Sequence, residues 1–268
     1  LLPFETLVDD NGNYLVDKYK FTYLNSGRDF MGFNKPSINS GIVTLFGNPD
    51  FNFQVGEPST ETCQDKQQEP NRCPESSGFS FSSLPGTERE VNQINEVLTN
   101  ENVETFKSQF ASEATLKKIE SPKILHIATH GFFQKNITID GDNQKTRAML
   151  TVSDATKPSD ISINGEEINN PLLASGIALS GANRIQRGID IDDKTDDGIV
   201  SAMEIKGLNL KGTSLVVLSA CNTGIGDVER AQGVFGLRRA FQIAGARSLL
   251  MSLWKVPDSE TADLMRRF

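Results

Sequence analysis

Three short and nearly uninterrupted apolar runs constrain the fold more than any other feature of the sequence. They span residues 122–128, 214–220 and 248–253. Runs of this length are typical of β-strands that are covered on both faces, as in parallel sheets. Between the last two runs, residues 231–244 carry an apolar helical stripe that Gly245 ends. A strand, a helix and a second strand of these lengths predict a right-handed βαβ unit.

Length and charge narrow the class of protein. The chain has 268 residues, with 27 Lys and Arg against 35 Asp and Glu, and a formal net charge of −8. Such a chain, with no long basic run, is not expected to bind nucleic acid or an anionic membrane directly. No apolar run approaches the ~20 residues that cross a bilayer. Three cysteines are too few for a disulfide framework, which predicts a reducing, cytoplasmic location.

Turn residues and periodicity predict the remaining elements. We expect a tight turn, two strands and a short helix at residues 10–13, 19–24, 41–46 and 112–119, in that order. Thr87 and Glu90 fit a capping box at the start of another helix. The buried stripe of that helix would consist of Val91, Ile94, Val97 and Leu98. Residues 260–268 form an amphipathic helical pattern without a stop signal, so we expect the native protein to continue.

Two segments are predicted to be mobile loops. Residues 56–82 contain almost no aliphatic side chain, which predicts a solvated or disordered insertion. Cys63 and Cys73 lie in it, and a reducing compartment favours two free thiols over a small disulfide loop. The acidic stretch 188–198 matches no register of the EF-hand template, which leaves calcium a weak alternative.

Chemically useful residues follow two of the apolar runs. His130 and Gly131 follow the first run, and Cys221 follows the second. Ligands bind beyond the carboxyl ends of parallel strands, so an imidazole and a thiol are expected at one edge of the sheet. A cysteine nucleophile needs a neighbouring base because a free thiol has a pKa of about 8.5. Gly131 lacks a β-carbon, so its amide could approach a substrate carbonyl as an oxyanion donor.

Other interpretations of these residues stand beside this one. A histidine and a cysteine can fall at strand ends by chance, and a buried cysteine is more often a small hydrophobic residue than a nucleophile. A zinc site of His126, His130 and Cys221 is not expected, because the two histidines would lie ~13 Å apart along a strand. His126, inside its apolar run, is predicted to be a hydrogen-bonded core residue.

The segments around the histidine and the cysteine also carry a resemblance. Leu-His-Ile-Ala-Thr-His-Gly at 125–131 and Val-Leu-Ser-Ala-Cys-Asn-Thr-Gly at 217–224 resemble the two signature motifs of CHAT-domain proteins, caspase-like cysteine peptidases related to separases. Further blocks in the family's order lie at residues 2–5, 23–28, 46–49, 84–88, 173–183, 236–241 and 252–258. Residues 231–233 are Ala-Gln-Gly where family members usually carry Glu-Gly, a departure that affects either a substrate contact or the helix start.

The resemblance implies one CHAT peptidase domain over residues 1–268. Its fold would be an α/β, caspase-like three-layer sandwich around a mostly parallel sheet, lacking its first strand and its C-terminal end. His130 and Cys221 would form the catalytic dyad, with the amides of Gly131 and Cys221 as the oxyanion hole. The substrate would be a protein, and no metal or organic cofactor would be required. An upstream tetratricopeptide or other sensor region of the same protein would control activity.

The same resemblance and the predicted βαβ unit suggest a specificity pocket. Trp254, Lys255 and Asp258 follow the last predicted strand and are expected to line the pocket for the residue before the cut. A lysine there would favour an acidic or uncharged side chain, unless Lys255 is simply solvated at the start of a loop. Two other functions remain open, namely an inactive pseudo-protease that serves as an interaction module and a thioesterase or transferase with the same dyad.

Overall fold

The computed structural model of the chain divides into two compact units, Leu1–Pro36 and Ser37–Phe268. The residues that it describes are 6–21, 38–54, 81–133, 162–163, 166–167, 172, 175–184, 196–220, 236–252 and 258–267. Among these residues, none of the helices is long and apolar enough to span a bilayer.

The first unit contains the predicted tight turn. One carboxylate oxygen of Asp9 accepts hydrogen bonds from the amides of Asn11 and Asn13, at 2.9 and 3.0 Å. Gly12 has a φ of 83°, which glycine adopts at no steric cost. A short helix, α1 (Leu15–Lys18), follows the turn. The strand predicted at 19–24 is not present at residues 19–21, and residues 22–24 lie outside the described part.

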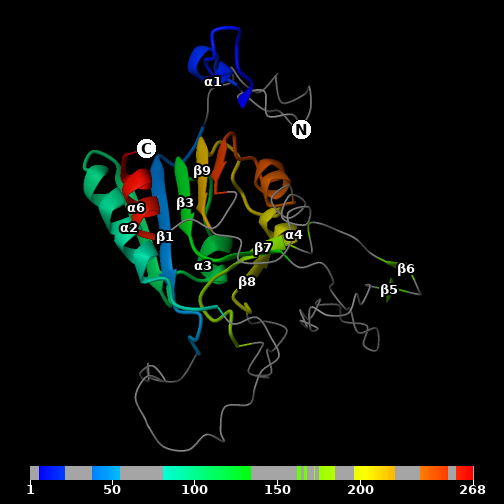
Figure 1. Cartoon of the computed structure of the whole chain (residues 1–268). Coiled ribbons are helices and arrows are strands. Elements are labelled where there is room, and N and C mark those ends of the chain that lie inside the picture. The colour runs from blue at the N-terminus through cyan, green and yellow to red at the C-terminus, as the bar shows by residue number, and fades with distance from the viewer. Residues whose placement is uncertain are drawn as a thin grey trace, which may run out of the picture. The chain divides into compact units, whose positions relative to one another are not determined.

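A five-stranded sheet forms the centre of the second unit (Figure 1). Its strands are β1 (Ile42–Pro49), β2 (Asn102–Ser108), β3 (Ile124–Ala128), β9 (Leu215–Ser219) and β10 (Leu249–Met251). They lie in the order β10-β9-β3-β1-β2, and every neighbouring pair is parallel. The three apolar runs are therefore strands of one parallel sheet, as predicted, with β10 at one edge and only partly buried. Strand β2, at the other edge, was not anticipated.

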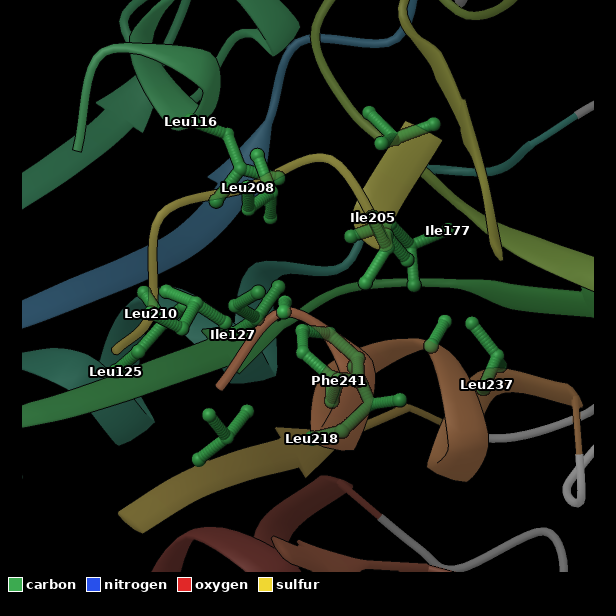
Figure 2. Close-up of a cluster of buried hydrophobic side chains, with 14 of the residues drawn as sticks. Leu116, Leu125, Ile127, Ile177, Ile205, Leu208, Leu210, Leu218, Leu237 and Phe241 are labelled. Carbon is green, nitrogen blue, oxygen red and sulfur yellow. The ribbon is translucent and has the colours of Figure 1, made fainter. Parts of the chain in front are cut away.

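Helices cover both faces of this sheet (Figure 1). On one face α2 (Pro85–Val97) packs beside α6 (Asp258–Arg267). Val91 of α2 lies on Val43, Leu45 and Ala128 of the strands. The other face packs against α3 (Glu113–Lys117), α4 (Ala202–Ile205) and a helix at 236–243. Figure 2 shows this second core, whose fully buried members include Leu116, Leu125, Ile127, Ile205, Leu218 and Phe241. The three layers confirm the predicted α/β, caspase-like architecture.

Short antiparallel strands complete the fold. β4 (Gly131–Phe133), β7 (Ser175–Ala178) and β8 (Ile199–Ser201) form one small sheet in the order β4-β7-β8. β5 (Ser162–Ile163) and β6 (Glu166–Glu167) form another. Because β4 starts directly after His130, the first small sheet fixes the direction in which the chain leaves β3.

The predicted capping box at Thr87 is wrong. Helix α2 begins at Pro85, two residues before Thr87, and its N-cap, Leu84, makes no side-chain cap bond. The Thr87 hydroxyl accepts instead from the amide of Asn48 at 2.8 Å and donates to the Leu84 carbonyl at 2.7 Å. These tertiary contacts outweigh the local capping signal. Glu90 therefore does not cap the helix, and its side chain is buried instead. Of the predicted stripe, Val91 is fully buried, but Val97 is 56% exposed.

Candidate active site

The carboxyl ends of β3, β9 and β10 meet at one edge of the central sheet. Ala128 of β3 pairs with Ser219 of β9, so the chain positions two residues further along each strand are His130 and Cys221. Cys221 itself lies outside the described residues. A β-carbon built on Gly131 would lie 3.4 Å from the β-carbon of Ala220, the residue before Cys221. The segment that follows His130 therefore contacts the end of the strand that leads to the cysteine.

His130 lies in an aromatic enclosure and is 8% exposed. The rings of Phe51 and Phe81 lie beside the imidazole, with centroids 5.3 and 5.7 Å from its own. The Nε2 atom of His130 is 2.9 Å from the backbone carbonyl oxygen of Ser82. A carbonyl oxygen only accepts hydrogen bonds, so Nε2 carries a proton and donates. In the neutral ring, Nδ1 is then the basic nitrogen.

The backbone amide of Gly131 points away from strand β7. It stands opposite Ile177 in the β4–β7 ladder, and the amide of Ala178 donates to the carbonyl of His130 at 2.9 Å. This bond makes Gly131 and Ile177 a non-hydrogen-bonded pair, in which the Gly131 N–H points away from β7. The Gly131 N–H therefore points to the side of β4 that faces away from β7.

The buried interior near the site contains a polar cluster of Glu90, His126 and Ser219. The Glu90 carboxylate of α2 contacts Nε2 of His126 at 2.7 Å and accepts from the hydroxyl of Ser219 at 3.1 Å. All three residues are buried, with exposed fractions of 2%, 3% and 7%. His126 is thus a hydrogen-bonded core residue, as predicted. The cluster joins α2 to both strands that lead to the candidate site.

The predicted pocket residues are only partly within the described structure. Trp254 and Lys255 lie outside it, and Asp258 is the first residue of α6. The strand before them does run beside β9, with Met251 opposite Leu218. The hydroxyl of Ser252 donates to the carbonyl of Ala220 at 2.7 Å, which fastens the end of β10 to the residue before Cys221.

The segment 56–82 contributes to the site in a way that its composition did not suggest. Residues 55–80 lie outside the described structure, but Phe81 and Ser82 pack against His130. The sequence does carry one indication of this contact, namely the two aromatic residues Phe79 and Phe81 in an otherwise polar segment. Large aromatic side chains in such a segment favour a contact with the folded part of the chain.

The end of the acidic stretch 188–198 is anchored by Lys117 and Glu113 of α3. Lys117 pairs with both Glu113 and Asp196, the latter at 3.1 Å, and the second carboxylate oxygen of Glu113 accepts from the Gly198 amide at 3.1 Å. Burial raises the pKa of Glu113 to about 7, against the opposing effect of Lys117. Residues 188–195 lie outside the described structure, and within it no group of three or more His, Cys, Asp or Glu could hold a metal ion.

Comparison with known proteins identifies a family. The family model of the CHAT domain matches residues 1–268. A search of curated proteins found none that matches.

Proposed function

The chain belongs to the CHAT-domain family, and from this membership and the setting of His130 we propose that it is a cysteine endopeptidase that makes limited cuts in a partner protein. The observation that carries the proposal is the imidazole of His130, protonated on Nε2, at the sheet edge to which β9 leads Cys221. CHAT domains are related to caspase-like peptidases, and the family also includes inactive members. The activity of this chain therefore rests on the dyad.

The proposed reaction has two stages. In the first, Nδ1 of His130 takes the thiol proton of Cys221, and the thiolate attacks the scissile carbonyl carbon. The amides of Gly131 and Cys221 bind the oxyanion, and His130 returns its proton to the leaving amine as the C–N bond breaks. In the second, His130 removes a proton from water, which attacks the thioester and releases the second product with a regenerated thiol.

The proposal extends to partners and compartment. Its substrate is a protein, and an upstream tetratricopeptide or other sensor region of the same protein controls access to the dyad. The reaction belongs in a reducing compartment such as the cytoplasm, since Cys221 acts only as a free thiol or thiolate. Trp254, Lys255 and Asp258 are proposed to line the pocket for the residue that precedes the cut.

The deciding experiment compares lysate proteins cut by the full-length protein with those cut by Cys221→Ala and His130→Ala, using mass spectrometry of new termini. Both substitutions should abolish cleavage, while the matched cysteine control Cys73→Ala should retain it. Cleavage that persists in Cys221→Ala would remove the peptidase assignment. Absence of cleavage together with absence of labelling by a thiol-directed activity probe would favour the interaction module. Turnover of small acyl esters without proteolysis would favour the thioesterase.

A further inference from the structure

Asn183 makes an unusual set of bonds behind the candidate site. Its side chain is buried, and its Oδ1 accepts from the backbone amide of Phe81 at 2.9 Å. Its Nδ2 donates to the backbone carbonyl of Phe81 and to Oδ1 of Asn52, both at 3.0 Å. The side-chain amide therefore pairs with both backbone groups of Phe81, as a neighbouring β-strand would.

The pairing with Asn183 orders the backbone at Phe81 in the way that a helix or strand would. Residues 81–84 belong to no helix or strand, so no ladder fixes the direction of the Ser82 carbonyl. That carbonyl is the acceptor for Nε2 of His130, and it follows Phe81 directly in the chain. Because Asn183 fixes the backbone of Phe81 on both sides, it also fixes where the next carbonyl points.

Asn183 also contacts the aromatic enclosure of His130. The backbone amide of Asn183 donates to the carbonyl of Phe51 at 2.9 Å, and Phe51 and Phe81 are the two rings beside the imidazole. Asn183 itself lies in a turn that is tied to Asp50, whose carbonyl accepts from the Gly181 amide at 2.9 Å and from the Ser180 hydroxyl at 3.2 Å. The turn, the rings and the carbonyl thus form one connected support.

We propose that Asn183 is a positioning residue that determines which nitrogen of His130 carries the proton. By holding Phe81 it aims the Ser82 carbonyl at Nε2, which keeps the proton there and leaves Nδ1 as the base that receives the Cys221 proton. A histidine tautomer is set by the hydrogen bond of its other nitrogen, so loss of the carbonyl acceptor permits the second tautomer. The inference rests on the proposed function for its catalytic consequence but not for the tautomer itself.

Asn183→Asp is the sharpest test because it preserves the shape of the side chain. The aspartate keeps an acceptor for the Phe81 amide, but it places a carboxylate oxygen opposite the Phe81 carbonyl and Asn52 Oδ1, where two donated bonds were. The pairing with Phe81 should open. Asn183→Ser, which is too short to pair with both groups of Phe81, is the second variant.

The first readout is nitrogen NMR of the histidines in the full-length Cys221→Ala protein, which needs no enzymatic activity. The signals of His126 and His130 are assigned by substituting each histidine in turn. His130 should be the Nε2–H tautomer in the Cys221→Ala protein and a mixture of tautomers once Asn183→Asp is added. The control is the core variant Leu116→Ala, whose substitution destabilises the protein at a position distant in sequence from the turn of Asn183. It should leave the tautomer of His130 unchanged.

The second readout is kinetic, in the protein with Cys221 intact. Asn183→Asp should lower kcat by about a hundredfold with little change in KM, because misplacement of a catalytic group acts on the reacting geometry. A folded variant with an unchanged tautomer would overturn the proposal, and so would unfolding of both variants, since Asn183 would then serve only the fold. A tautomer change in a protein whose Cys221→Ala form still cuts would refute the endopeptidase proposal and leave the positioning role of Asn183 intact.

Discussion

Replacement of Glu90 by leucine should be among the most destabilising single substitutions in this chain. The carboxylate is the shared acceptor of His126 and Ser219, and all three groups are buried. Glu90→Leu leaves an imidazole N–H and a hydroxyl without their acceptor, at about 1–3 kcal/mol for each group. The sum agrees with the ~3–5 kcal/mol that accompanies the breaking of a buried polar pair. We therefore expect the free energy of unfolding to fall by about 3–5 kcal/mol.

The measurement is equilibrium unfolding in guanidinium chloride, followed by circular dichroism. The matched control is the triple variant Glu90→Leu, His126→Leu, Ser219→Ala, in which no polar group is left unsatisfied. Replacement of a whole buried polar cluster by apolar residues is often close to neutral, so the triple variant should recover most of the lost stability. A loss below about 1 kcal/mol in Glu90→Leu, or no recovery in the triple variant, would refute the reasoning.

Three further predictions concern other parts of the molecule. Gly176→Ala should lower the free energy of unfolding by about 1–3 kcal/mol, because a β-carbon there would meet the carbonyl of Val200 at 2.5 Å and the ring of Phe132 at 2.6 Å; an unchanged unfolding curve would contradict this packing. Glu113, with its pKa raised from 4.5 to about 7, holds its proton longer in the folded state, so stability should decline as pH rises between these values. Unfolding at several pH values measures this decline, which Glu113→Gln should flatten. In a peptide-library profile, Lys255→Asp should shift the residue preferred before the cut from acidic or uncharged towards basic, and an unchanged preference would remove Lys255 from the pocket.

The sequence predicted the strands whose residues form continuous apolar runs. Strands β3 and β9 were found because both of their faces are covered, which leaves an apolar run in the sequence. Strand β10 lies at a sheet edge and is only partly buried, but its residues are all apolar, so the same pattern predicted it. Strand β2, at the opposite sheet edge, was missed because its side chains are exposed or only partly buried and its sequence, Asn-Val-Glu-Thr-Phe-Lys-Ser, carries no apolar run. The start of α2 was misplaced because Asn48, far away in the sequence, takes up the Thr87 hydroxyl.

Only the part of the candidate site that consists of chemically distinctive side chains could be predicted from the sequence. His130 and Gly131 were proposed as site residues from their position after β3, and the neighbouring strand ends follow from parallel pairing. The partner of His130 could not be found in this way, because it is a backbone carbonyl, and every residue has one. Asn183 acts on another backbone segment and leaves no pattern of its own for the same reason.

The pairing of β3 with β9 also has a consequence for biosynthesis. These neighbours in the sheet are separated in the chain by residues 129–214, so their pairing closes a long loop and depends on contacts that form slowly. A growing chain that has not yet emerged from the ribosome through β9 holds His130 without the proposed nucleophile. We expect the proposed peptidase to be proteolytically silent until β9 and Cys221 have been synthesised, which would protect the ribosome and its neighbours during translation.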